Sequence, residues 1–133
     1  MAGTNRPSGL TDADILIDAS RGVPQAVQFL LDQRTASGIC ISVISQMELI
    51  AGCRDKTELA QVDQLATSVR VLPLTDAVSI TACELMKTFR LSHGLLLPDS
   101  LIAATAINAG LQLYTRNMRH FQMIPNLSVV RPY

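Results

Sequence analysis

The sequence predicts an α/β domain of three layers, in which helices cover both faces of a central parallel sheet of four to five strands. Short segments rich in Val, Ile and Leu alternate with longer segments of helical character, and no hairpin turn separates the candidate strands. Successive strands are therefore expected to pair in parallel through helical crossovers. Because 48% of the 133 residues are hydrophobic, we expect one domain over residues 9–133, preceded by a flexible lead over residues 1–8.

The N-terminal part predicts a strand, an ambiguous segment and a helix. A brief strand at residues 9–12 leads into residues 13–18, which are apolar and fit a strand or a helix on periodicity alone. Pro24 favours the first turn of a helix, and the apolar residues after it recur at helical spacing. We expect this amphipathic helix to end at Gly38.

A buried strand and a capped helix are expected next. The β-branched residues at 39–44 predict the strand. Ser45 and Glu48 form the Ser-x-x-Glu pattern of a capping box, which predicts a helix that begins at Ser45. A further helix is predicted over residues 57–67.

The second half of the chain is predicted to continue the alternation. Its expected elements are a strand at residues 69–72, a helix from Thr75 or Asp76 to about His93, a helix from Asp99 to Gly110, a strand at residues 111–115, a turn or helical stub at residues 116–121 and a final strand at residues 127–130. Cap-forming residues open both helices, and a glycine follows each of them.

The amino-acid composition restricts the partners and the cellular location that we expect for this protein. Eleven basic residues balance eleven acidic ones, so an RNA partner would have to be attracted by a local patch or a metal. The scarcity of aromatic residues disfavours a platform for base stacking. The three cysteines, Cys40, Cys53 and Cys83, lie apart in apolar surroundings and indicate a reduced, cytoplasmic protein. No signal sequence and no apolar run of spanning length is present, so we expect no membrane association.

Polar residues follow the predicted strands at one edge of the sheet, where doubly wound folds bind ligands. Asp12 follows the first strand, Glu48 follows the second, Asp99 opens the helix before the fourth and Asn117 follows the fourth. Gathered carboxylates repel one another unless a cation neutralises them. Oxygen ligands without His or Cys partners favour Mg²⁺ or Mn²⁺.

Each polar residue also has a purely structural interpretation. The alternatives are Asp99 as a helix N-cap, Glu48 as the partner of Ser45 in a capping box, Asp14 as a cap partner of Thr11, Asp18 as a solvated or helix-end residue and Asn117 as a turn former. His93 and His120 have no partner at metal-ligand spacing, so we interpret both as surface or cap groups.

Four segments carry a family likeness. They are residues 12–22, 41–52, 98–106 and 113–121. In this order and spacing they resemble the PIN-domain ribonucleases, and closely the toxins of VapBC toxin–antitoxin pairs. The resemblance implies a PIN-like fold and cleavage of structured RNA by a Mg²⁺- or Mn²⁺-dependent endonuclease. It also implies a cognate antitoxin as partner and a homodimer.

The resemblance also implies roles for individual residues. Asp12, Glu48 and Asp99 match the catalytic metal ligands, and Asn117 stands where the family often has a fourth acid. That asparagine removes one formal charge, which is expected to weaken the binding of a second metal ion more than the binding of a first. A second departure is the polar first strand, which replaces the usual apolar one and makes the placement of Asp12 the least secure.

Further residues are expected to support this site. Thr115 matches a hydroxyl residue that accompanies the fourth position, and Asp14 is expected beside the ligands. Arg21, Arg116 and Arg119 flank the acids in sequence and are candidates for positioning RNA phosphates.

Other functions fit less of the sequence. Asp12-Ala-Asp14 has the Asp-x-Asp form of haloacid-dehalogenase-type phosphotransferases but lacks their preceding apolar strand. A response-regulator receiver needs a lysine after its last strand, and none follows Lys87. A catalytically silent PIN-fold protein that binds RNA or a protein is the main alternative, because of Asn117.

Overall fold

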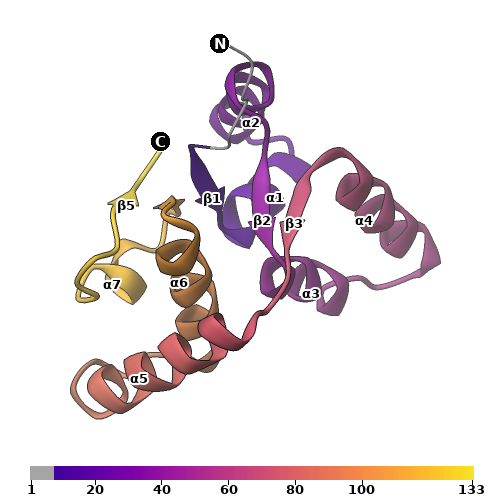
Figure 1. Cartoon of the computed structure of the whole chain (residues 1–133). Helices are drawn as coiled ribbons and strands as arrows, with labels where there is room; N and C mark the ends of the chain where they lie inside the picture. The colour runs from indigo at the N-terminus through magenta and orange to yellow at the C-terminus, as the bar shows by residue number, and fades with distance from the viewer. Residues whose placement is uncertain (1–7) are drawn as a thin grey trace.

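The computed structural model describes residues 8–133, which form helices and short strands in alternation (Figure 1). The elements are β1 (Gly9–Thr11), α1 (Ala13–Ser20), α2 (Pro24–Ala36), β2 (Cys40–Ser42), α3 (Val43–Ala51), α4 (Lys56–Ser68), β3 (Arg70–Leu72), α5 (Asp76–His93), α6 (Leu97–Ala109), β4 (Gln112–Tyr114), α7 (Met118–Phe121) and β5 (Val129–Val130). The predicted flexible lead over residues 1–8 lies, except for Ser8, outside the described residues.

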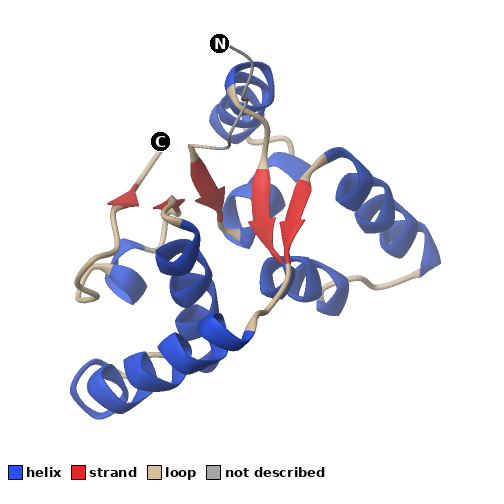
Figure 2. Ribbon diagram, viewed as in Figure 1, coloured by secondary structure: helices blue, strands red, loops and turns tan. Residues whose placement is uncertain are grey.

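All described strands pair in parallel, as predicted, but they form two sheets instead of one. One sheet has the order β1-β4-β5 and the other contains β2 and β3. β1 and β2 lie side by side and in contact (Figure 2), so the two sheets meet edge to edge. With only two or three residues per strand, few backbone groups are available for a ladder between them. The prediction of one continuous sheet of four to five strands was therefore wrong.

Helices cover both faces of the larger sheet, because successive side chains of a strand point to opposite faces. Leu113 of β4 packs in a core with α5, α6 and α7, whereas the next residue, Tyr114, packs with Ile15 of α1 and Ala26 of α2. In β5, Val129 packs in the core with Leu113, and Val130 packs in the core with Tyr114. The three-layer arrangement is thus confirmed.

Helix starts in the first half depart from the predictions. The ambiguous segment 13–18 belongs to α1, because Asp12 caps that helix by accepting a hydrogen bond from the Ala13 N–H. The predicted capping box at Ser45 was wrong. Ser42 caps α3 instead, by accepting from the Ile44 N–H, and Ser45 is buried inside the helix. Glu48 is therefore not a capping residue.

Helix starts in the second half place Asp99 differently. Thr75 caps α5, as one of the two predicted candidates. α6 begins at Leu97, two residues earlier than predicted, with Pro98 in its first turn. Asp99 consequently lies inside the first turn and is not the N-cap. No helix among residues 8–133 is long and apolar enough to span a membrane.

Candidate functional site

Asp12 and Asp14 lie at the carboxyl end of β1 and are joined by one threonine from the end of β4. The Thr115 hydroxyl lies 2.8 Å from Asp12 Oδ2 and 3.3 Å from Asp14 Oδ2. The parallel pairing of β1 with β4 brings these residues together across a separation of more than 100 positions. Asp12 is 5% exposed and Thr115 is fully buried.

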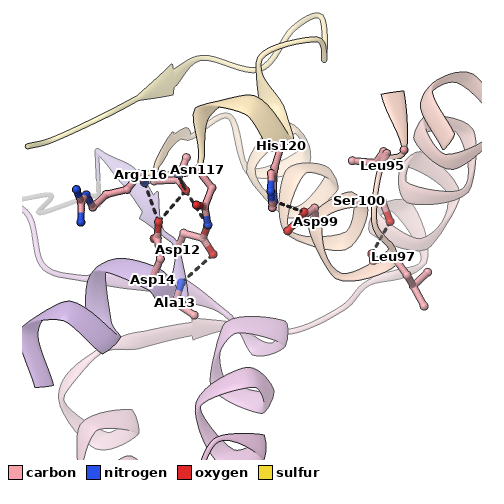
Figure 3. Close-up of polar contacts among 12 residues, drawn as sticks. Asp12, Ala13, Asp14, Leu95, Leu97, Asp99, Ser100, Arg116, Asn117 and His120 are labelled. Atoms are coloured by element: carbon pink, nitrogen blue, oxygen red, sulfur yellow. Dashed lines mark hydrogen bonds and ion pairs between the residues drawn. The ribbon is translucent and has the colours of Figure 1, made fainter. Parts of the chain in front are cut away.

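Asp14 is only partly satisfied by protein donors. Its Oδ2 accepts a hydrogen bond of 2.8 Å from the Arg116 backbone N–H, whereas its buried Oδ1 has no partner among the described residues. Figure 3 shows Asp12 and Asp14 next to the backbone of Arg116 and Asn117. A buried carboxylate oxygen without a protein partner is suited to accept a ligand.

Asp99 lies on α6 and pairs with a histidine of α7. His120 Nδ1 lies 3.0 Å from Asp99 Oδ2 (Figure 3). The Asp99 side chain is 14% exposed and the imidazole 46% exposed. The imidazole therefore shields one carboxylate oxygen and fixes the orientation of the group.

Glu48 on α3 completes the group of acids as its most exposed member. Burial of its carboxyl and the nearby charges of Asp99 and Asp14 raise the pKa of Glu48. Burial also raises the pKa of Asp99, against the opposing effect of His120, and the charge of Asp14 raises it further. The charges of Asp14 and Asp99 therefore disfavour the ionised form of Glu48, and the charge of Asp14 disfavours that of Asp99.

Among the four acids, Asp12 has the pKa that departs furthest from its ordinary value. Burial is the main cause that raises the pKa of Asp12 to about 7, and the charges of Asp14 and Glu48 add to it, while the hydrogen bonds from Thr115 and Ala13 oppose it. Burial likewise raises the pKa of Asp14. The acids thus destabilise one another in their ionised forms, and a cation would relieve this.

The donor set fits a hard divalent ion, although Asp12 and Asp99 are already paired with protein groups in this structure. Within residues 8–133, no group of three or more acidic, histidine or cysteine side chains is arranged to hold an ion. The unpartnered Oδ1 of Asp14 and the exposed carboxylate of Glu48 nevertheless offer oxygen ligands. With the carboxylates of Asp12 and Asp99, they make a ligand set that consists of oxygen alone. Mg²⁺ and Mn²⁺ are bound by such carboxylates together with water.

The other predicted residues divide between two cavities. Asn117, Arg116 and Arg119 line a cavity of about 540 Å³ that also contains Asp99. Arg21 lines a separate groove of about 810 Å³ that contains Glu48 and runs between α1, α3 and α4. Asn117 uses its backbone N–H to donate to the Thr115 hydroxyl, and its side chain is exposed. The structure therefore does not bring Arg21 together with the other two arginines.

Two features near the acids escaped the sequence reasoning. His120 is exposed, as interpreted, but it also pairs with Asp99. Asp18 was interpreted as a solvated or helix-end residue. It lies in the last turn of α1, but its Oδ2 accepts from Arg116 Nη1 at 3.0 Å and from the Tyr133 hydroxyl at 2.8 Å. No sequence signal indicated either contact, because each joins residues that lie 21 to 115 positions apart.

Comparison with known proteins gives consistent results. The family model "PIN domain" matches residues 10–125. Ribonuclease VapC10 of Mycobacterium tuberculosis (strain ATCC 25618 / H37Rv) is 42% identical over 119 residues, which are 89% of each chain. Ribonuclease VapC19 of the same strain is 36% identical over 120 residues, which cover 89% of this chain and 95% of that protein.

Solved structures show the same fold. A toxin–antitoxin complex from Klebsiella pneumoniae contains a chain with a TM-score of 0.77 and 31% identity, over 95% of this chain and 98% of that one. DNA-bound VapBC from Salmonella typhimurium contains one with a TM-score of 0.79 and 25% identity, over 92% and 96% respectively.

Proposed function

The chain belongs to the PIN-domain family, and from this membership we propose that it is a metal-dependent endoribonuclease toxin that cleaves structured RNA. It is a homologue of the VapC ribonucleases over most of its length. The observation that carries the proposal is the pair of acids at the end of β1, where Thr115 joins Asp12 to Asp14 and the buried Asp14 Oδ1 has no partner among the described residues. The charges of Asp14 and Asp99 act on Glu48 nearby.

The acids and their hydrogen-bond partners have distinct proposed roles. Asp12, Glu48 and Asp99 would hold Mg²⁺ or Mn²⁺, with the open Oδ1 of Asp14 beside them. A bound divalent ion supplies positive charge for the scissile phosphate and lowers the pKa of a water molecule. Thr115 holds Asp12 in place.

Glu48, the most exposed of the four acids, is the one that we propose takes up the proton of the attacking water. Since water attacks, the RNA 2′-hydroxyl is not required. We expect products with 5′-phosphate and 3′-hydroxyl ends.

The relatives support proposals about partners. VapBC and other toxin–antitoxin assemblies among the structural relatives contain a toxin chain and an antitoxin. We propose that a cognate antitoxin holds this chain inactive, that the chain forms a homodimer and that it acts on RNA in the cytoplasm. Translation-related RNAs are the expected substrates.

The decisive experiment incubates the purified protein with a pool of tRNA and rRNA, in Mg²⁺ or in EDTA. We expect cleavage only in Mg²⁺ and its loss in Asp99→Asn, which removes one of the carboxylate charges. Asp63→Asn is the matched control, because Asp63 is an exposed acid of α4 away from the site. Cleavage that persists in EDTA, or an Asp99→Asn variant as active as the control, would contradict the mechanism.

The same experiment tests the alternative of a silent RNA-binding module. That alternative predicts retention of RNA without any cut product in Mg²⁺ or Mn²⁺. The exposed amide of Asn117, at a position where an acid would add charge, is the feature that favours it.

A further inference from the structure

Arg116 has its backbone beside the group of acids and its side chain turned away from them. Its backbone N–H donates to Asp14 Oδ2 at 2.8 Å, and the residue lines the same cavity as Asp99. Figure 3 shows the side chain extending from this point toward the side opposite Asp99. The guanidinium group is therefore attached next to the acids but is bound elsewhere.

Asp18 and Tyr133 hold the guanidinium group in this position. Arg116 Nη1 donates to Asp18 Oδ2 at 3.0 Å, and the guanidinium carbon lies 5.0 Å from the centroid of the Tyr133 ring. The Tyr133 hydroxyl donates to the same oxygen of Asp18 at 2.8 Å. The Tyr133 ring also packs against the core that contains Ile15 and Tyr114. Both partners of Arg116 are thus anchored in the folded domain.

Asp18 does not favour the helix to which it belongs. It lies in the last turn of α1, where the helix dipole disfavours a negative charge. Alanine at this position would favour helix formation more than aspartate does. The acid is therefore explained by its contacts with Arg116 and Tyr133 and not by the stability of α1.

Without these contacts, Arg116 would compete with a metal ion for the acids. Its side chain is 39% exposed, so packing alone does not fix its rotamer. Asp14 Oδ1 is buried and has no partner among the described residues. A guanidinium group forms strong charge-assisted hydrogen bonds with such a carboxylate. A divalent ion at the site needs the same oxygens.

We propose that Asp18 and Tyr133 are positioning residues, a clamp that keeps the Arg116 guanidinium group out of the metal site. While the clamp holds, the carboxylates stay open to Mg²⁺ or Mn²⁺. When it is broken, Arg116 occupies them for part of the time, and the apparent Kd for the ion rises as the open fraction falls. The inference rests on the proposed metal-dependent function and assigns two further residues to it.

The experiment measures Mn²⁺ binding by the full chain without RNA, from the electron paramagnetic resonance signal of free Mn²⁺. We expect Asp18→Ala to raise the Kd for Mn²⁺ about three- to tenfold. Tyr133→Phe keeps the ring but loses the hydroxyl that fixes Asp18, so it should raise the Kd by a smaller factor. Asp32→Ala is the matched control, because Asp32 is an exposed acid on α2, and it should bind Mn²⁺ as the wild type does.

A second substitution separates release of the arginine from the simple loss of a negative charge. Arg116→Met removes the guanidinium group but keeps a long side chain and the backbone N–H. In the wild-type background, where Asp18 holds the arginine, it should change the Kd by less than about twofold. In the Asp18→Ala background it should return the Kd to near the wild-type value. If Arg116→Met changes the Kd by the same factor in both backgrounds, the inference is overturned.

Thermal unfolding in EDTA shows whether each variant keeps its fold. If Asp18→Ala does not, Asp18→Asn takes its place in both backgrounds, because it removes the charge and keeps the size of the side chain. A Kd for Asp18→Ala or Asp18→Asn equal to that of Asp32→Ala also overturns the inference, as does a wild type that does not bind Mn²⁺.

The two proposals can fail separately. If the four Mn²⁺ affinities follow the expected pattern but the wild type never cuts RNA in Mg²⁺, the ribonuclease function fails and the clamp stands. If the wild type cuts RNA in Mg²⁺ and Arg116→Met acts equally in both backgrounds, the clamp fails and the ribonuclease function stands.

Discussion

Thr115 is the residue that holds the two N-terminal acids in register. Its hydroxyl carries one proton, so at any moment it donates to Asp12 or to Asp14, and the shorter distance of 2.8 Å favours Asp12. Its oxygen simultaneously accepts the Asn117 backbone N–H at 3.0 Å. One buried side chain thus couples the end of β1 to the loop after β4.

Thr115→Val removes this hydroxyl and keeps the volume of the side chain. We expect kcat for RNA cleavage to fall about 10- to 100-fold, as is usual when a residue that orients metal ligands is lost. The reason is that Asp12 then loses one of its two hydrogen-bond donors. Cleavage rates at saturating RNA measure the effect.

Two further variants serve as controls for Thr115→Val. Thr115→Ser restores the donor and should recover most of the activity. Thr105→Val is the same change at another buried threonine, whose hydroxyl bonds only to the Leu101 carbonyl in α6. A loss of activity in Thr105→Val as large as in Thr115→Val would show that the effect comes from general destabilisation.

Asp12 makes the stability of the metal-free protein depend on pH. Its pKa is raised to about 7, mainly by burial, from an ordinary value of 3.8. Between these values the folded state binds more protons than the unfolded state, so stability falls as pH rises. The stabilising effect of the proton is complete below pH 4 and is lost as pH rises through 7.

Asp12→Asn should therefore stabilise the metal-free protein at pH 8 and abolish cleavage. The expected gain in the free energy of unfolding is roughly 1–3 kcal/mol, because a neutral amide replaces a buried charge but keeps only one acceptor oxygen. At pH 4 the gain should vanish. Urea unfolding in EDTA at the two pH values measures it, and a loss of stability at both would refute the argument.

The position of Asp12 at the end of β1 could be predicted from the sequence, and that of Asp99 to within two residues of the start of α6. The position of Glu48 inside α3 could not, because the start of that helix was predicted wrongly. The interactions of Asp14 and His120 could not, since both arise from contacts that only the folded chain creates. Asp99 illustrates the difference. Its place in the first turn of α6 follows closely from Pro98, but its pairing with His120 depends on the short helix α7.

At the scale of the elements, Gly9 explains how a polar first strand can pair in the sheet. A methyl group on Gly9 would overlap the ring of Tyr114. Gly9 pairs with Gln112 of β4, and Tyr114 lies two residues further along that strand. That ring packs edge-on against Phe29 with a centroid distance of 5.0 Å, and the Tyr114 hydroxyl accepts a hydrogen bond from Gln112 Nε2. The missing side chain of Gly9 therefore makes room for an aromatic residue of the second core.

Gly9→Ala is expected to lower the free energy of unfolding by roughly 1–3 kcal/mol, as for other overpacked sites. Because β1 leads directly into Asp12, cleavage should fall as well. Gly52→Ala is the control, since its added methyl would meet only backbone oxygens at 3.6 Å. Chemical denaturation of both variants tests this, and equal stability would contradict the packing argument.

Most elements could be predicted because they are delimited by local signals. Pro24 begins α2, Thr75 caps α5 and Gly110 ends α6, all as expected. The start of α3 was predicted wrongly because two serines compete for the cap, and Ser42 is the one with extended backbone geometry. Sequence alone does not say which of two capping residues lies outside the helix.

At the scale of the whole molecule, long-range contacts hold the C-terminal segment and the loop after β4 against α1, next to Asp14. Arg116 stacks over the Tyr133 ring at 5.0 Å, and both residues bind Asp18, which lies 98 and 115 positions away. The Tyr133 hydroxyl is the main cause that lowers the pKa of Asp18. The division into two sheets and this network could not be predicted, because both depend on pairing between distant segments.

The repulsion within the group of acids leads to a prediction for the entire domain. A ligand that binds only the folded state stabilises it by RT ln(1 + [L]/Kd), or about 1.4 kcal/mol at ten times Kd. We therefore expect Mg²⁺ at that concentration to raise Tm at pH 8 by roughly 3–6 °C. Because protonated Asp12 competes with the ion, the increase should be smaller at pH 5.

The variants separate ion binding at the site from a general effect of salt. Asp99→Asn should lose most of the Mg²⁺-dependent increase in Tm, because one of the acids that interact with Glu48 is neutralised. Glu84→Gln, which removes an exposed acid paired with Lys87 on α5, should keep it. NaCl at the same ionic strength should not reproduce the increase in the wild type. If it does, or if Asp99→Asn gains as much as Glu84→Gln, the four acids do not form an ion-binding site.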